Sequence, residues 1–367
     1  MRIAIIDADL IGRKRHRFPN LACMKLSGYH KDRGDSVALT TKYNDLQQFD
    51  HVYVSKVFTD TPIPDAVLTL PNVSYGGTGF FYDKAAPLPD EVEHHMPDYR
   101  LYDEWVEEQI RLGKKPKEFA CYTDYSIGFL TRGCFRHCPF CVNRGYDRSE
   151  PHSPLSEFLD PGRPKICLLD DNFFACSAWR ELLTELKRTG KPFQFKQGLD
   201  ERLLTDEKCE ALFSSRLDGD VIFAFDNAAD APLIEEKLKL IRKHTSKVPK
   251  FYCFCGYDRS GKWDKDFWRQ DIFNLLKRIE ILSRYRCLPY VMRFSRYTES
   301  PYRGAYITIA RWCNQPSFFK KKTLREFIAV NGEKSACFKY LRDFEERFPE
   351  VSFYYDMRFG ERSADEQ

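Results

Sequence analysis

The chain has 367 residues, a length that suggests two or three domains. Hydrophobic residues make up 43% and charged residues 31% of it, so the chain can build a substantial core and a well-solvated surface. The 58 basic and 54 acidic side chains leave a net charge of only +4, which does not by itself indicate a nucleic-acid partner. No apolar stretch approaches the ~18 residues of a membrane span, so no membrane partner is predicted.

The start of the chain and its cysteines indicate its compartment and its redox state. Acids interrupt the apolar start at Asp7 and Asp9, where a signal peptide would continue, so we expect a cytoplasmic protein. The thirteen cysteines are an odd number in a chain too large to need disulfides for stability. We therefore interpret them as reduced thiols, a few of which bind metal.

The first 86 residues predict a Rossmann-like domain with a parallel sheet. Strand patterns occur at 3–6, 37–39, 51–54 and 67–73, and a helical pattern occupies 20–31. Strands that alternate with helices favour ligand binding at the strands' carboxyl ends. The basic run Arg13–Arg17 is interpreted mainly as a solvated loop. The glycine-rich turn at 76–79 fits neither phosphate-binding glycine fingerprint, and so carries little weight.

Residues 87–120 predict a linker between domains. Prolines recur at 87, 89, 97 and 116, and one short helix is predicted at 103–113. His94 and His95 are expected to be solvent-exposed in this segment.

Residues 121–309 predict a partial (β/α)6 barrel of the TIM type. Six apolar runs, at 127–130, 166–169, 193–195, 221–225, 251–254 and 290–294, are expected to be strands. Helices are expected at 177–189, 206–215, 231–244 and 264–284, with Ser177 and Thr205 as N-caps. Catalytic groups of such barrels lie on the loops after the strands. Residues 310–367 predict a helical carboxyl-terminal extension with a frayed end.

Three cysteines follow the first of these strands at C-x3-C-x2-C spacing: Cys134, Cys138 and Cys141. A structural zinc site normally needs four protein ligands, and the fourth would have to be His137 or a distant cysteine. A four-iron–four-sulfur cluster held by three cysteines instead keeps one iron open. Cys253 and Cys255 would lie on the same face of the fifth strand and could bind a second cluster, but free cysteines are so often buried that core packing is favoured.

Polar residues also follow several of the other predicted strands. Asp170, Asp171 and Asn172 follow the second strand, Gln197 the third, Asp226 the fourth and Arg293 the sixth. Each alone is an ordinary turn residue. Together, at one edge of a barrel, they favour a common site.

The cysteine motif, with the aromatic Phe140 before its last cysteine, resembles the cluster loop of the radical SAM superfamily. The resemblance covers residues 125–296. It implies that Cys134, Cys138 and Cys141 bind a [4Fe-4S] cluster whose open iron chelates S-adenosylmethionine, and that one-electron reduction gives a 5′-deoxyadenosyl radical. It further implies cofactor contacts by Phe140, Asp170, Asp171, Asn172, Gln197 and Asp226. The catalytic residues toward substrate stay unknown.

The front domain resembles that of the radical SAM branch with an amino-terminal cobalamin-binding-like domain. The branch's D-x-H-x-x-G signature is absent, because Asp9 follows Asp7 and His16 is not so spaced. The residues therefore leave open whether cobalamin binds and whether the reaction is methyl transfer.

The resemblance implies a one-electron reductant of the flavodoxin or ferredoxin type as partner, and a substrate that the sequence does not identify. An alternative function is a nucleic-acid-binding protein with a structural iron–sulfur cluster. Basic residues are interleaved with aromatic ones at 13–17, 284–286, 293–297 and 320–322. Sites that stack nucleobases on aromatic rings and bind phosphates with basic side chains have this composition. RNA or protein as a macromolecular substrate would reconcile the two functions.

Overall fold

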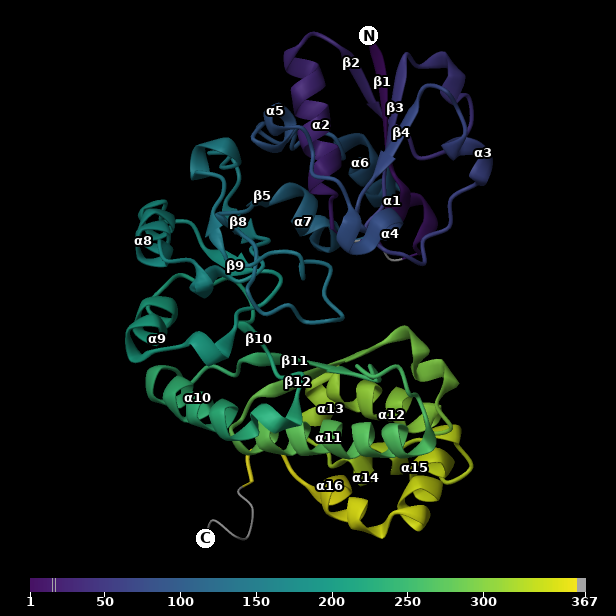
Figure 1. The fold of residues 1–367 in the computed structure, drawn as a ribbon, viewed down its shortest axis with the longest axis vertical. Coiled ribbons are helices and arrows are strands. Elements are labelled where there is room, and N and C mark those ends of the chain that lie inside the picture. Colours follow the sequence, from purple (N-terminus) through teal and green to yellow (C-terminus); the bar gives the residue numbers. More distant parts are fainter. Residues whose placement is uncertain (15, 17, 362–367) are drawn as a thin grey trace. The chain divides into compact units, whose positions relative to one another are not determined.

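The computed structural model describes residues 1–14, 16 and 18–361, so two arginines of the basic run, Arg15 and Arg17, and the predicted frayed end lie outside the described residues. The chain divides into two compact units, Met1–Lys196 and Gln197–Gln367 (Figure 1). Each unit is built around parallel strands with helices, which confirms the α/β class. The predicted four-part domain division stays a prediction.

The first unit begins with a four-stranded parallel sheet of order β2-β1-β3-β4, in which β1 is Arg2–Asp7, β2 Ser36–Leu39, β3 His51–Ser55 and β4 Val73–Gly76. Both faces of β1 are buried, Ile3 and Ile5 on one side and Ala4 and Ile6 on the other, as a central parallel strand requires. The helices of this region are α1 (Ala8–Gly12), α2 (Leu21–Asp32), α3 (Asp65–Leu68) and α4 (Thr78–Phe81).

The prediction of a strand at 67–73 is wrong. The start of that run belongs to α3, and β4 begins only at Val73. Pro64 precedes α3 and Asp65 stands in its first turn, a favourable helix start, whereas Pro71 cannot continue either element. The β-branched Val73 then starts the strand.

The predicted linker is a packed part of the first unit. It holds α5 (Asp90–Glu93) and α6 (Asp103–Arg111), α7 (Ala120–Thr123) begins at its last residue, and its residues Tyr102, Val106 and Phe119 share a core cluster with Ile3 and Ile5. His94 and His95 are half-buried rather than exposed, because His94 contacts Glu157 and His95 contacts Asp32.

A second parallel sheet, of order β5-β8-β9, completes the first unit. Its strands are β5 (Tyr125–Gly128), β8 (Lys165–Leu168) and β9 (Phe193–Phe195), and α8 (Trp179–Arg188) lies between the last two in the chain. Ser177 is not the N-cap of α8; Ala178 holds that position without a capping side chain. Between β5 and β8 in the chain lies a short antiparallel pair, β6 (Thr131–Arg132) and β7 (Glu150–Pro151).

The second unit contains a parallel sheet of order β10-β11-β12, with β10 at Ile222–Ala224, β11 at Lys250–Cys255 and β12 at Leu288–Arg293. Helices α9 (Asp206–Phe213), α10 (Ala231–His244) and α11 (Lys265–Arg284) form where they are predicted, and Thr205 caps α9 as expected. The carboxyl-terminal region is helical, with α12 (Arg303–Cys313), α13 (Pro316–Phe319), α14 (Leu324–Ala329), α15 (Ala336–Arg347) and α16 (Ser352–Asp356).

All six predicted barrel strands exist, three in each unit. Their assembly into one partial barrel stays a prediction. In the part of the chain that the structure describes, no helix combines the length and the apolarity that crossing a bilayer requires.

Candidate functional site

The cysteine loop, which we define as residues 133–149, is closed at its base by the β6–β7 pair. Thr131 faces Pro151 and Arg132 faces Glu150 in that pair. Gly133 opens the loop at φ +97°, and a Cβ there would lie 2.2 Å from the Arg148 carbonyl oxygen. Only glycine accommodates both the positive φ and this close approach of the backbone. The loop therefore leaves the sheet from a fixed point.

The three cysteines are half-buried thiols in this loop, and two of their sulfur atoms accept hydrogen bonds. Asn172 Nδ2 lies 3.4 Å from Cys134 Sγ, and the Asn143 amide nitrogen lies 3.4 Å from Cys141 Sγ. The Cys141 amide also donates to the Cys138 carbonyl at 2.9 Å, which forms a turn between the last two cysteines. N–H donors of this kind are the groups that hydrogen-bond the sulfur atoms of iron–sulfur clusters.

Asp170 and Asp171 attach the loop to the end of β8. Asp170 Oδ1 accepts hydrogen bonds from Thr131 N and Thr131 Oγ1, both at 2.7 Å, and Oδ2 accepts one from Leu130 N at 3.2 Å. Asp171 Oδ2 accepts one from Gly133 N at 2.8 Å, and its Oδ1 accepts one from Asn143 Nδ2 at 2.5 Å. Of the predicted cofactor contacts, Asp170 thus binds the backbone at the start of β6, just before the loop, and Asp171 binds the loop itself.

Burial sets the electrostatics of this pair. Desolvation raises the pKa of Asp170 to about 7, opposed by its hydrogen bonds from Thr131 and Leu130. Desolvation also raises the pKa of Asp171, opposed by the Gly133 amide and by Arg132. Both carboxyl groups therefore depend on the loop's donors to hold a charge in a buried place.

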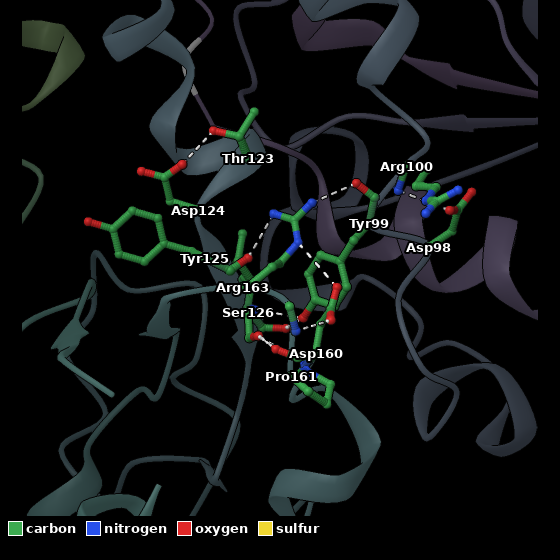
Figure 2. A network of polar contacts seen from close by, with 12 residues as sticks. Asp98, Tyr99, Arg100, Thr123, Asp124, Tyr125, Ser126, Asp160, Pro161 and Arg163 are labelled. Atoms are coloured by element: carbon green, nitrogen blue, oxygen red, sulfur yellow. Dashed lines mark hydrogen bonds and ion pairs between the residues drawn. The ribbon is translucent and has the colours of Figure 1, made fainter. Parts of the chain in front are cut away.

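The strand that precedes the loop is fixed by a network around Arg163, shown in Figure 2. The Arg163 guanidinium donates to the carbonyl oxygens of Tyr99 and Tyr122, both at 2.7 Å, and to that of Tyr125 at 3.1 Å. Tyr99 Oη in turn accepts a hydrogen bond from Ile127 N at 2.7 Å, in the middle of β5. This network connects Tyr99 of the predicted linker to β5, so β5, which precedes the cysteine loop, cannot shift independently of that segment.

The donor set of the loop is three thiols, the ligand type of iron–sulfur clusters. Among the described residues, no three side chains of His, Cys, Asp or Glu are arranged to hold one metal ion. The thiolates of a four-iron cluster bind different irons, so they need not meet at one point. His137, the candidate fourth zinc ligand, has its Nδ1 2.8 Å from the Arg144 carbonyl oxygen and its Nε2 3.5 Å from Asp147. Three thiols on a pinned loop fit the cluster.

Phe140 is half-buried in the loop, and its carbonyl accepts a hydrogen bond from Tyr82 Oη at 2.5 Å. Of the other predicted site residues, Asn172 lies beside Cys134, whereas Gln197 and Asp226 belong to the second unit. Gln197 is exposed there, and Asp226 Oδ1 accepts a hydrogen bond from Phe254 N at 2.8 Å, which fastens the end of β11.

Two residues with polar roles in these regions escaped the sequence reasoning. Asn143 bridges Asp171 and Cys141, but the sequence offered only a polar residue after a cysteine. Glu201 is 1% exposed, and its Oε2 accepts a hydrogen bond from Ala224 N at 3.1 Å. The sequence signal for Glu201 was the acid pair Asp200–Glu201 shortly after a glycine, Gly198, which has a positive φ in the structure.

Cys253 and Cys255 are core thiols. Both are buried, and both donate to backbone carbonyls, Cys253 to Phe251 at 3.7 Å and Cys255 to Met292 at 3.4 Å. Burial raises the pKa values of both thiols, Cys253 to about 12. A protonated thiol in apolar surroundings is a poor metal ligand, and this favours core packing over a second cluster.

The carboxyl end of β1 does not fit a histidine-ligated cobalamin. His16 Nδ1 is 2.6 Å from Tyr122 Oη and its Nε2 is 3.6 Å from Asp7 Oδ2, so both ring nitrogens face protein groups. Tyr102 Oη donates to the same Asp7 oxygen at 2.9 Å. Tyr102 of the predicted linker and Tyr122, just after it, thus cover this strand end, and we derive no reaction step through cobalamin.

Comparison with known proteins finds a likeness at the level of structure. No family model and no curated protein matches the chain. The solved structure of the radical S-adenosylmethionine methyltransferase TsrM from Kitasatospora setae, with cobalamin and a [4Fe-4S] cluster bound, is similar at a TM-score of 0.51. The match has 12% sequence identity and covers 80% of this chain and 74% of that one. It shows that the chain shares this α/β fold.

Proposed function

We propose that the chain is a radical SAM enzyme whose cluster is held by Cys134, Cys138 and Cys141. The observation that carries the proposal is the cysteine loop itself: three thiols at C-x3-C-x2-C spacing, after a parallel strand, on a loop pinned at its base. A [4Fe-4S] cluster bound there would supply one electron to cleave S-adenosylmethionine into methionine and a 5′-deoxyadenosyl radical. The fold shared with TsrM supports the proposal.

The chain's own residues would hold and shield this chemistry. Asp170 and Asp171 fix the loop, and Asn143 and Asn172 direct N–H groups at two of the cysteine sulfurs. Hydrogen bonds to cluster sulfurs raise the reduction potential, since they stabilise the added negative charge. We assign contacts with S-adenosylmethionine to Phe140 and Asn172, on the family resemblance.

The tip of the loop would receive the electron donor. Phe135 is 38% exposed, and the Arg136 guanidinium lies 4.6 Å from its ring centroid. An exposed aromatic beside a cation suits a transient contact with an acidic flavodoxin- or ferredoxin-type reductant.

The test is anaerobic reconstitution of the full chain with iron and sulfide, then reduction in the presence of S-adenosylmethionine. We expect about four irons per chain and 5′-deoxyadenosine as the product on chromatography. The Cys134→Ala, Cys138→Ala and Cys141→Ala variants should lose the product, whereas Cys337→Ala, a matched cysteine far along the sequence, should keep it. Parallel reactions with cobalamin would reveal methyl transfer through S-adenosylhomocysteine. An iron–sulfur chromophore without cleavage, with and without candidate substrates, would contradict the proposal.

A further inference from the structure

A segment of the front sheet domain contacts the cysteine loop between its last two cysteines. The segment is the short turn Tyr82–Lys84, which follows α4. Tyr82 Oη donates to the carbonyl of Phe140 at 2.5 Å. Asp83 Oδ2 accepts from Arg144 Nε at 2.6 Å, and Arg144 Nη2 is 2.5 Å from the same oxygen. Arg144 Nη1 also donates to the Pro139 carbonyl at 3.3 Å, so one side chain joins the loop to the front domain.

The front domain holds this turn firmly, through the glycine-rich run at 76–79. Gly79 N donates to the Lys56 carbonyl at 2.9 Å, just after β3. A Cβ on Gly77, which has φ +106°, would lie 2.4 Å from that carbonyl oxygen, and one on Gly79 would lie 2.9 Å from it. The glycines therefore let β4 and α4 pack against the end of β3. This close packing fixes the position of the Tyr82–Lys84 turn, which follows α4 directly.

The backbone of Tyr82 is held in an unusual conformation. It has φ +52° and ψ −116°, which a residue with a side chain rarely adopts. Such a conformation costs on the order of 1–3 kcal/mol and persists where surrounding contacts hold it. Here the contact is the Tyr82 hydroxyl on the loop, and the adjacent Asp83 is only 18% exposed despite its surface position.

We propose that Tyr82 and Asp83 are positioning residues that hold the Pro139–Cys141 turn of the cysteine loop, with Arg144 as their partner on the loop. Hydrogen bonds to the Phe140 and Pro139 carbonyls fix the backbone on either side of Cys141 N, which itself donates to Cys138 O. The front domain thereby sets the separation of the second and third thiols. The inference rests on the proposed function for its catalytic consequence, but the ordering of the loop is independent of it.

The test compares the alkylation rates of Cys138 and Cys141 in the metal-free full chain, mapped by mass spectrometry with Cys121 as internal reference. We expect Asp83→Ala and Arg144→Ala to raise these two rates about three- to tenfold, since each removes a charge-assisted contact. Tyr82→Phe should give a smaller rise. The control is Arg148→Ala, which removes another arginine of the same loop, paired with Glu150 at 3.0 Å. Its Cys138 and Cys141 rates should match those of the wild type.

A second readout follows the reconstituted cluster. Addition of S-adenosylmethionine should change the electron paramagnetic resonance spectrum of the reduced wild-type cluster, and Asp83→Ala should weaken this change. The exchanged pair, Asp83→Arg with Arg144→Asp, should restore part of it, which a general loss of stability would not allow. Equal alkylation rates in wild type and Asp83→Ala would overturn the proposal. Rates that still depend on Asp83 in a chain that binds no cluster would support this inference and sink the proposed function.

Discussion

Buried carboxyl groups bind backbone amides at strand ends in both units. Among the described residues, Glu201 is a buried carboxyl with one oxygen that accepts no hydrogen bond. Asp170 binds the backbone after β5, Asp226 the end of β11, and Glu201 the end of β10. Within the described residues no hydrogen bond reaches Glu201 Oε1, and Arg202 Nε lies 4.0 Å away. Desolvation, with the neighbouring Asp200 charge, raises the pKa of Glu201 to about 8. The group is therefore neutral at pH 7.

This predicts a pH-dependent stability. A carboxyl whose pKa rises from 4.5 in the unfolded chain to about 8 in the fold binds its proton more tightly when folded. Its contribution is complete below pH 4.5 and is lost as the pH rises through 8. The wild type should therefore lose on the order of 5 kcal/mol of unfolding free energy relative to Glu201→Gln between these pH values. Urea unfolding at several pH values, followed by tryptophan fluorescence, measures this.

A matched control keeps this prediction specific. Glu236→Gln removes an exposed carboxyl from α10, whose side chain is 70% exposed. Its difference from the wild type should not change with pH. If Glu201→Gln behaves in the same way, Glu201 is ionised in the fold and its pKa is not raised.

At this scale the sequence predicts the residue types but not their partners. Asp170, Asp171, Asn172 and Asp226 follow strands as expected. The turn pattern does not say whether their oxygens accept backbone amides or stay open for a ligand. That depends on where the neighbouring strand ends, which is a property of the tertiary structure.

At the scale of elements, the cysteine loop owes its shape to contacts that no local pattern encodes. The strands β6 and β7 have two residues each and pair across the whole loop. Such short elements leave no periodicity to detect. Helices α10 and α11, by contrast, have long amphipathic patterns with clear ends, and they form within a residue of the predicted bounds. Long periodic elements were predictable, and the short elements that shape the site were not.

The contacts of the loop predict a specific defect in Asp171→Ala. This change removes the acceptor of both Gly133 N and Asn143 Nδ2, and hydrogen bonds to a charged acceptor contribute about 1.5–3 kcal/mol each. We expect the reconstituted variant to release iron to a chelator at least about tenfold faster than the wild type, because its loop opens more often.

The matched variant is Asp147→Ala, another acid of the same loop, whose side chain is 92% exposed. It should release iron at the wild-type rate. Should Asp171→Ala retain iron normally and only bind S-adenosylmethionine more weakly, Asp171 would be a cofactor ligand, as the family resemblance implies.

At the scale of the whole molecule, charge separates the proposed enzyme from the nucleic-acid-binding alternative. The net charge is +4, and several arginines of the aromatic–basic segments already have partners in the fold. Arg296 lies 3.8 Å from the Trp263 ring centroid and pairs with Glu299 at 2.6 Å, and Arg293 lies 4.4 Å from the ring centroid of Tyr297. Stacking on these rings would have to compete with the arginines that cover them.

We therefore expect the full chain to bind single-stranded RNA weakly and without sequence preference. Only a few phosphates would be neutralised, so the affinity should already be low at roughly 50 mM salt, fall by only about tenfold toward 200 mM and leave little binding at the upper end. Fluorescence anisotropy of labelled oligonucleotides across this range measures the slope. Arg296→Ala should change the affinity no more than Arg342→Ala, an exposed arginine on α15 paired with Glu346. Tight binding that survives the higher salt and depends on Trp263 and Arg296 would favour the alternative, because stacking rather than net charge would then hold the strand.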